Sequence, residues 1–214
     1  MLHTLVNQYG LNEDRVMCAF AGVNARVPDV LQFNNRNVTP NRILFVGVDW
    51  LRKGGPDLLE AFALVRDQFP QAELTIVSGY VGEPTAPIPG VSFLGRIPVE
   101  EIGKHFASSH IFCMPSHLEP FGIVFIEAMA YGLPIISTRI GALPDLVTDG
   151  VNGYLVSPGD VPSLAKSLTR ILGNQEEFEA MSRAARQSYE NQFTWKAVIS
   201  SIRSRIVTDI TLSQ

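Results

Sequence analysis

The sequence predicts an α/β protein built on an open, doubly wound parallel sheet. Short apolar runs of strand length alternate with longer segments at helical spacing, which is typical of parallel strands joined by crossover helices. The first run, Ile43-Leu-Phe-Val-Gly-Val48, is continuously apolar, as expected of a strand covered on both faces. Helices that connect successive strands as right-handed crossovers make the neighbouring strands of the sheet parallel.

The elements are expected in a regular order after residue 40. Strands are predicted at 43–48, 73–78, 91–94, 111–114, 133–137 and 153–156. Helices are predicted at 56–69, 99–108, 121–131, 143–147, 161–172, 176–192 and 195 to about 208. Ligands of such sheets bind outside the carboxyl ends of the strands. The loops that share this edge follow Val48, Ser78, Leu94, Pro115 and Ser137.

Residues 1–40 differ from the remainder of the chain. They are polar and rich in turn-like clusters, and they contain one short apolar run at 16–23. We interpret them as a linker and the tail of a preceding domain. The sequence therefore predicts a linker at 1–40, a binding domain at 41–193 and a terminal helix at 194–214.

Composition limits the class of protein. The 214 residues are 46% hydrophobic and 18% charged, with a net charge of −4, and the basic residues are scattered. Scattered basic residues argue against a nucleic-acid partner, which needs clustered cations. The chain shows neither a membrane-spanning run nor a signal-like start. Cys18 and Cys113 lie far apart in the sequence, so a reduced, cytoplasmic setting is the simpler interpretation, and a disulfide stays open. A peripheral membrane contact through a further domain also stays open.

Several common site motifs are absent. The sequence contains neither a G-x-x-x-x-G-K-[ST] phosphate loop nor a G-x-G-x-x-G after a strand, so ATPase and dinucleotide-binding functions lose their main support. An Asp-x-Asp pair that could hold a divalent cation on a diphosphate is also missing. We expect structural roles for His105 and His110, a core position for Cys113, and no metal site.

The strongest candidate for a binding site is the loop between residues 115 and 122. It leads directly from a strand into a helix that starts near Phe121 and Gly122. The free N–H groups of Gly122, Ile123 and Val124, together with the helix dipole, form an anion site. Glycine at position 122 lets a phosphate approach the backbone closely.

Two carboxylates frame this anion site. Glu119 lies just before the helix, and Glu127 interrupts its apolar sequence. A carboxylate accepts hydrogen bonds from two hydroxyls of a diol, so this layout suits a nucleoside diphosphate sugar. Alternatively, Glu119 is a solvated loop residue and Glu127 is an acid favoured only by the helix dipole. A buried carboxylate without a partner is costly, which favours function.

Lys53 is the candidate cation. It follows the first strand in Arg52-Lys-Gly-Gly55, at the same edge of the sheet. A diphosphate leaving group develops negative charge, which a lysine can stabilise where no metal motif exists. Judged alone, Lys53 is more often a solvated loop residue.

These residues resemble family 4 of the retaining, GT-B-fold glycosyltransferases (glycosyl transferases group 1). Glu119 and Glu127 match the family's Glu-x7-Glu signature. The similar segments, in order, are Phe45-Val-Gly, Lys53-Gly, Val91-Ser-Phe-Leu-Gly95, Met114-Pro-Ser116, Glu127-Ala-Met-Ala-Tyr-Gly-Leu-Pro134, Gly141-Ala-Leu-Pro144 and Asp149-Gly-Val-Asn-Gly153. The resemblance covers roughly residues 14–206.

The resemblance implies two Rossmann-like domains, with the donor held mainly by the C-terminal one. It implies transfer with retention, without a metal or other cofactor. Catalytic roles fall to Glu119, against the transferred sugar, and to Lys53, at the diphosphate. Glu127 would contact the ribose, and the backbone near Arg96 and Ile97 would lie close to the base. The full set of expected donor-binding residues is Arg52, Lys53, Arg96, Ile97, Glu119, Phe121, Gly122, Ile123, Val124 and Glu127.

The sequence departs from the family pattern in two ways. Val48 stands where the family has an arginine that assists the lysine, and Arg52 is the candidate substitute. An N-terminal acceptor domain is also missing, so we expect the isolated chain to bind donor without transferring it, and the terminal helix to pack on that domain. The main alternative is a non-catalytic nucleotide-sugar-binding or interaction module. A sugar-nucleotide epimerase is a further alternative, but it lacks support because the sequence shows no matching acid/base set. The base, the sugar and the acceptor stay open.

Overall fold

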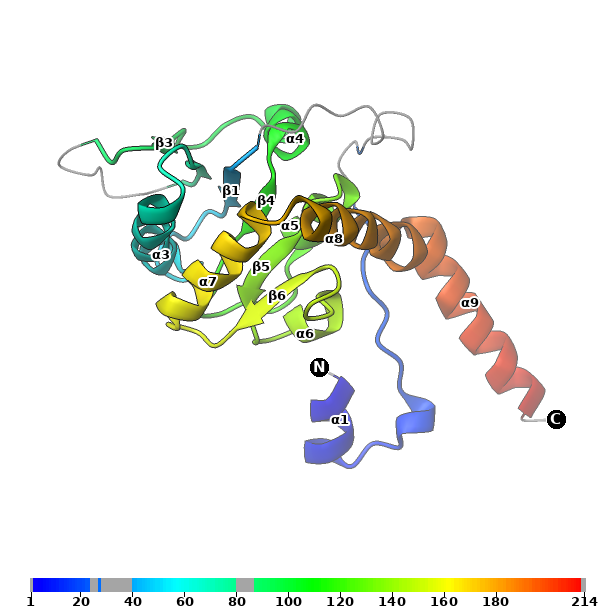
Figure 1. Cartoon of the computed structure of the whole chain (residues 1–214). Coiled ribbons are helices and arrows are strands. Elements are labelled where there is room, and N and C mark those ends of the chain that lie inside the picture. Colours follow the sequence, from blue (N-terminus) through cyan, green and yellow to red (C-terminus); the bar gives the residue numbers. More distant parts are fainter. Residues whose placement is uncertain (1, 24–26, 28–39, 80–86, 213–214) are drawn as a thin grey trace.

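The computed structural model describes residues 2–23, 27, 40–79 and 87–212 and contains one six-stranded parallel sheet (Figure 1). The strand order is β3-β2-β1-β4-β5-β6. The strands are β1 (Arg42–Val46), β2 (Glu73–Val77), β3 (Val91–Phe93), β4 (Ile111–Cys113), β5 (Ile135–Thr138) and β6 (Gly153–Val156). The order reverses between β1 and β4, and this reversal is the point at which doubly wound sheets bind ligands.

The helices follow the strands in the order expected of crossover connections. They are α1 (Leu2–Tyr9), α3 (Gly55–Gln68), α4 (Val99–Ser108), α5 (Ile123–Ala130), α6 (Leu143–Leu146), α7 (Val161–Leu172), α8 (Gln175–Ser188) and α9 (Trp195–Leu212). A 3-10 turn spans Glu13–Arg15, and a π-helical turn spans Tyr189–Phe193 between α8 and α9. The predicted fold class is therefore confirmed.

Helices cover both faces of the sheet. α3 and α7 pack against each other, and α7 also lies on β5 and β6. Right-handed crossovers place α4 and α5 on the opposite face of the sheet. There the ring of Phe106, on α4, stacks on Tyr131 at the end of α5, with centroids 5.4 Å apart. The core between these layers contains the fully buried side chains Phe45, Phe62, Phe112, Phe125, Ile43 and Leu74.

The predicted strands and helices after residue 40 are all present, and their ends differ by a few residues. The largest shifts are at α8, which ends at Ser188 instead of 192, and at α9, which ends at Leu212 instead of about 208. α5 begins at Ile123 instead of 121. α5 starts late because Gly122 adopts the left-handed conformation, with φ +88°, and so stands outside the helix. α8 ends early because the chain continues as the π-helical turn.

Residues 1–40, interpreted above as a linker and the tail of a preceding domain, contain one described α-helix. Residues 28–39, with the predicted turn cluster, lie outside the described residues. Residues 2–9 form α1, which the sequence analysis missed (Figure 1). The apolar run 16–23 is extended and packs on the body of the protein: Phe20 meets Phe193 edge to face, with centroids 5.1 Å apart. A Cβ on Gly22 would lie 2.6 Å from the Trp195 ring, so the glycine permits this contact.

α9 extends away from the sheet toward the C-terminus (Figure 1). Its apolar residues Trp195, Ile199, Ile206 and Val207 are exposed. The helix itself was predicted, while its docking on a further domain stays a prediction. Of the helices in the described part of the chain, none has the length and apolar character to cross a membrane.

Candidate functional site

A pocket of about 510 Å³ opens outside the carboxyl ends of the central strands, at the reversal of strand order. We call it the switch-point pocket. It is lined by Val46, Gly47, Val48, Lys53, Val77, Ser78, Gly79, Gly95, Arg96, Ile97, Val99, Ile102, Met114, Val124 and Glu127. Its charged side chains are Lys53, Arg96 and Glu127, and most of its other walls are aliphatic or glycine. Four of the five predicted loops meet at or beside this pocket.

The turn after β1 is held against the loop after β4 by Gly54. This glycine has φ +73°, and a Cβ there would lie 1.9 Å from the carbonyl oxygen of Pro115. Any other residue would force the two loops apart. Gly47 allows a second close approach, since its Cβ would lie 3.1 Å from Lys53 Cγ and 3.2 Å from Met114 Sδ. Lys53 is therefore seated where β1 and β4 end.

The loop from Pro115 to Glu119 is fixed from the other side by residues at the end of β5 and just after it. Ser137 and Thr138 donate hydrogen bonds to the carbonyl oxygens of Met114 and Ser116. Gly141, with φ +53°, packs so closely that a Cβ would lie 1.9 Å from the carbonyl oxygen of Glu119. The loop after Ser137 thus reaches the site by supporting Glu119 rather than by lining the pocket.

Lys53 and Glu119 form an ion pair between Nζ and Oε2. Their side chains are only 13% and 5% exposed, respectively, so the pair is largely withdrawn from water. Lysine has three N–H donors, and Glu119 occupies one of them. Lys53 also lines the switch-point pocket, and Glu119 does not. The structure therefore brings the two predicted catalytic residues into direct contact.

The N-terminus of α5 has the geometry of an anion site. Val124 lines the pocket, and no hydrogen bond to a described residue engages the N–H groups of Gly122, Ile123 or Val124. These orphan donors and the helix dipole favour a negatively charged group at this end. At the opposite end of α5, the guanidinium of Arg186 donates to the carbonyl oxygen of Ala130, which holds the helix in place.

Gly122 has a different role from the one expected. A Cβ at this position would meet its own helix, 2.6 Å from Cδ2 of Phe125. With φ +88°, the residue turns the chain sharply into α5. The glycine is thus required by the backbone conformation itself, whether or not a phosphate approaches.

Glu127 lies on α5 inside the pocket. Burial raises the pKa of its carboxyl above the ordinary value. None of the described residues forms a hydrogen bond or ion pair with it. The Glu127 carboxylate acts in turn on Tyr131, whose pKa is raised by burial and then by that negative charge. An acceptor held without a partner in a partly buried pocket is available to the hydroxyls of a ligand.

Two other predicted residues face away from the pocket. Arg52 Nε lies 3.0 Å from Asp49 Oδ2, and its Nη1 donates to the carbonyl oxygen of Leu118 at 3.1 Å. These contacts join the two loops, and Arg52 does not line the pocket. Phe121 lies in an aromatic group with Phe20, at a centroid distance of 6.5 Å. Phe121 therefore anchors the N-terminal segment.

Arg96 and Ile97 line the far side of the pocket, after β3. They are accompanied by residues that the sequence analysis did not select: Ser78, Gly79, Val99, Ile102 and Met114. The position of Ser78 and Met114 just after β2 and β4 was the available signal. Val99 and Ile102 are on α4, where they looked like ordinary helix residues.

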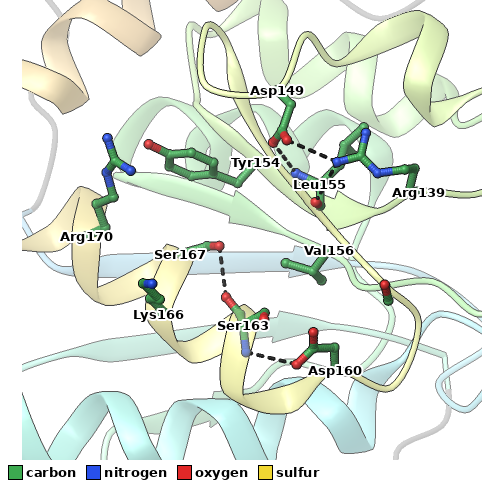
Figure 2. Close-up of a pocket in the computed structure, with 11 residues that line it drawn as sticks. Arg139, Asp149, Tyr154, Leu155, Val156, Asp160, Ser163, Lys166, Ser167 and Arg170 are labelled. Carbon is green, nitrogen blue, oxygen red and sulfur yellow. Dashed lines mark hydrogen bonds and ion pairs between the residues drawn. The ribbon is translucent and has the colours of Figure 1, made fainter.

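A second hollow, of about 350 Å³, lies at the β6 edge of the sheet, between β6 and α7 (Figure 2). We call it the edge hollow. Arg139 and Asp149 form an ion pair at 3.0 Å, and together they satisfy the backbone of Leu155: Asp149 accepts from its N–H and Arg139 donates to its C=O. Arg170 pairs with Glu177 and lies over the ring of Tyr154. Burial and the hydrogen bond to Glu177 raise the pKa of Tyr154 to about 12.

The sequence analysis expected structural roles for the histidines and a core position for Cys113, and the core position of Cys113 is confirmed. His110 is buried, accepts a hydrogen bond from the N–H of Asn41 at Nδ1 and packs edge to face on Phe178. His105 is part-buried, and burial lowers its pKa. Cys113 is in the core, and both cysteines are free thiols. Among the described residues, no group of three or more His, Cys, Asp or Glu side chains could hold a metal ion.

The sheet order and the pocket at its reversal define a Rossmann-like α/β domain, and the orphan N–H groups of α5 make a candidate anion site beside that pocket. Its sequence identifies the family. Residues 28–188 match the model of the glycosyl transferases group 1, and the chain belongs to that family.

Individual relatives agree with this assignment. The chain is 32% identical over 181 residues to a sulfoquinovosyl transferase of Arabidopsis thaliana; the match covers 78% of this chain and 34% of the relative. The structure resembles the C-terminal domain of a group 1 glycosyl transferase from Francisella tularensis, with a TM-score of 0.67, 20% identity and coverage of 83% and 97%. It also resembles an Anabaena protein, HepE, solved with UDP and glucose, with a TM-score of 0.67, 21% identity and coverage of 84% and 53%. The chain thus spans about a third of the length of the Arabidopsis relative. Its fold matches that of the Francisella C-terminal domain.

Proposed function

We propose that this chain is the donor-binding domain of a metal-independent, retaining glycosyltransferase that uses a nucleoside diphosphate sugar. One observation carries the proposal. The Lys53–Glu119 pair and the orphan N–H groups of α5 converge at one end of a pocket that also holds the unpartnered carboxylate of Glu127. Family membership and the UDP in the HepE structure support the same choice of ligand.

In this proposal, each part of the ligand contacts a different group of the site. The diphosphate is placed between Lys53, which retains two free donors, and the N–H groups of residues 122–124. The ribose hydroxyls are placed at Glu127. The transferred sugar is placed toward Glu119, whose carboxylate also orients Lys53. As the bond to the diphosphate breaks, Lys53 and the helix N-terminus stabilise the negative charge that develops on the leaving group.

Nucleotide binding tests this proposal directly. Isothermal titration of the wild type with UDP, GDP and ADP is expected to detect binding of at least one of them. Glu127→Ala should weaken that binding about tenfold or more, because a hydrogen bond to a charged group contributes about 1.5–3 kcal/mol. Glu179→Ala, at an exposed glutamate of α8, is the matched control and should bind like the wild type. Undetectable binding of all three nucleotides, or full affinity in Glu127→Ala, would refute the donor site.

Transfer itself needs residues outside this chain in our proposal. The exposed apolar residues of α9 offer a surface for a further domain that supplies the acceptor site. We therefore expect this chain to bind donor without glycosylating an acceptor. Steady transfer to a free acceptor by the chain alone would contradict this part of the proposal.

One observation favours a second candidate, a nucleotide-sugar-binding module without catalysis. The pocket carries Val48 in place of the family's arginine, and Arg52 is engaged by Asp49 and Leu118 instead of replacing it. The diphosphate therefore meets fewer cations, and leaving-group stabilisation is weaker. Donor hydrolysis measured with a supplied acceptor domain distinguishes the two: nucleotide release above background supports the transferase, and tight binding without release supports the module.

A further inference from the structure

The loop that presents Glu119 is attached to the segment after β1 by three consecutive residues. The N–H of His117 donates to the carbonyl oxygen of Arg52 at 2.9 Å. The carbonyl oxygen of Leu118 accepts from Arg52 Nη1 at 3.1 Å, and Glu119 pairs with Lys53. The positions of the carboxylate and the ammonium therefore depend on how firmly this loop is held.

His117 makes a further contact, with the first turn of α3. Its Nε2 lies 2.9 Å from Oδ2 of Asp57. The side chain of Asp57 is 20% exposed, and that of His117 is 44% exposed. The two side chains join the loop after β4 to the helix that follows β1, a few residues along both segments from the Lys53–Glu119 pair.

The Oδ2 atom of Asp57 is buried, and none of the described residues donates a hydrogen bond to it. His117 Nε2 is within reach and still does not satisfy this oxygen with a hydrogen bond, so what the imidazole can offer is charge. A neutral imidazole leaves the buried oxygen uncompensated, which is costly, whereas an imidazolium supplies the missing positive charge. The contact is therefore strong when His117 carries a proton and weak when it does not.

The other cations of the two segments are already paired. Besides the aspartate, the charged residues of these segments and of the start of α3 are Asp49, Arg52, Lys53, Glu60 and Glu119. Of the two cations among them, Arg52 pairs with Asp49. The other, Lys53, pairs with Glu119. The charge on His117 thus decides whether the carboxylate of α3 is compensated.

We propose that His117 is a positioning residue that makes donor binding depend on pH, because its imidazolium, paired with Asp57, holds the loop that presents Glu119. This inference rests on the proposed donor site and adds a regulation of that site. Histidine changes its charge between about pH 5 and 8, so the contact should weaken, and donor affinity fall, as the pH rises through this range. Neither His117 nor Asp57 lines the switch-point pocket, so the effect passes through the loop.

Titration calorimetry at about pH 5.5 and about pH 8 tests the inference. The probes are UDP-glucose, GDP-mannose and ADP-glucose, whose diphosphate keeps its charge over this range, whereas the terminal phosphate of a free nucleoside diphosphate titrates at about pH 6. Burial raises the pKa of Glu127, which adds a pH effect of its own. The quantity to compare is therefore the ratio of the affinities at the two pH values, between the wild type and each variant.

Two substitutions of His117 fix its charge. His117→Gln is neutral at both pH values, and His117→Arg is positively charged at both and can pair with a carboxylate. The affinity ratio, lower pH over higher, should be about threefold to fivefold larger in the wild type than in either variant, since the pair is partly exposed. His117→Gln should bind as the wild type does at the higher pH. His117→Arg should restore tight binding there, which a merely structural role of the imidazole would not produce.

Asp57→Asn separates a contact through α3 from a direct attraction between the imidazolium and the donor. It removes the charge that His117 holds and should lower the affinity ratio to that of His117→Gln. His105→Gln, at a part-buried histidine of α4, is the matched control and should keep the ratio of the wild type. Urea denaturation at about pH 8, where the imidazole is neutral, should give His117→Gln the stability of the wild type.

The outcomes distinguish this inference from the donor site itself. If the wild type and His117→Gln give the same ratio, or if His117→Arg binds as weakly as His117→Gln at the higher pH, the inference is wrong while the donor site stands. If Asp57→Asn keeps the ratio of the wild type, the imidazolium acts on the donor directly, and the inference is also wrong. If the wild type binds none of the donors at either pH, the donor site fails and the inference fails with it.

Discussion

The two hollows of this domain differ in how their polar groups are used. In the edge hollow, Arg139, Asp149, Asp160 and Arg170 all bind other groups of the protein, and only the exposed Lys166 has no partner among the described residues. In the switch-point pocket, the partly buried Glu127 has no such partner, and neither has the exposed Arg96. Charged groups that pair within a protein support its structure, whereas unpaired ones beside apolar walls are available to a ligand.

The edge hollow has a structural purpose that explains its pairing. β6 is the last strand of the sheet, so one side of its backbone has no neighbouring strand. Asp149 and Arg139 take the place of that neighbour at Leu155. Capping an edge in this way prevents pairing with another chain. The comparison makes the edge hollow part of the scaffold and the switch-point pocket the site.

The largest effect is expected from Lys53→Met, because Lys53 both pairs with a buried carboxylate of the protein and lines the ligand pocket. Removing it leaves the Glu119 carboxylate buried without a partner, which should destabilise the fold by about 3 kcal/mol. Urea denaturation measures the loss, and titration should show that nucleotide binding is lost too. In the double variant Lys53→Met, Glu119→Leu, stability should largely return while binding stays lost. A double variant as unstable as the single one would contradict the pairing.

Gly141→Ala should be the next most damaging change. Its Cβ would collide with the carbonyl oxygen of Glu119, and φ is +53°, so we expect a loss of about 2–3 kcal/mol together with weaker nucleotide binding. Gly150→Ala is the matched control: φ is +77°, but nothing lies within 4 Å of its Cβ. It should cost about 1 kcal/mol from backbone strain alone and leave binding intact. Equal effects from both variants would show that the contact with Glu119 is unimportant.

Asp149→Ala should affect the edge hollow alone. The N–H of Leu155 loses its acceptor and Arg139 loses its partner, which should lower stability by about 1 kcal/mol. Nucleotide affinity should not change. Glu101→Ala, which breaks an exposed pair with Lys104, should cost less than about 0.5 kcal/mol and serves as the surface reference. A loss of nucleotide affinity in Asp149→Ala would show that the edge hollow takes part in binding.

The smallest effect concerns the pH dependence of stability at Glu127. Burial raises its pKa in the folded protein, so the folded state binds more protons than the unfolded chain as the pH rises above the ordinary glutamate value. Stability should therefore fall as the pH rises through the raised pKa and remain lower above it. In Glu127→Gln this contribution is absent, so the variant should gain melting temperature relative to the wild type across that window. Glu179→Gln should show no such gain.

Much of the fold could be predicted because strand and helix periodicities depend on local sequence. The continuously apolar runs at 43–48 and 111–114 indicated buried central strands, and the alternation with helices indicated parallel order. The anion site at the start of α5 also followed from local signals, since a loop ending in Gly122 leads into a helix. Lys53 and Glu119 were both selected, and the shared edge of the sheet explains why they meet.

The remaining features depend on contacts between distant residues. The sequence offered no means of seeing that Asp49 and Leu118 hold Arg52, or that Phe20 packs on Phe121. Val99 and Ile102 line the pocket because α4 lies beside the end of β3. The roles of Gly54 and Gly141 depend on loop carbonyls that are far away in the sequence.

The most direct test of the central claim is to map nucleotide binding on the backbone amides by NMR. The tightest-binding of UDP, GDP and ADP would be added to the ¹⁵N-labelled chain. We predict large shifts at the N–H groups of Gly122, Ile123 and Val124, smaller shifts at Gly79 and Ile97, and none at Leu155 or Ser163. Shifts concentrated at Leu155 and Ser163, with residues 122–124 unmoved, would contradict the assignment of the two hollows.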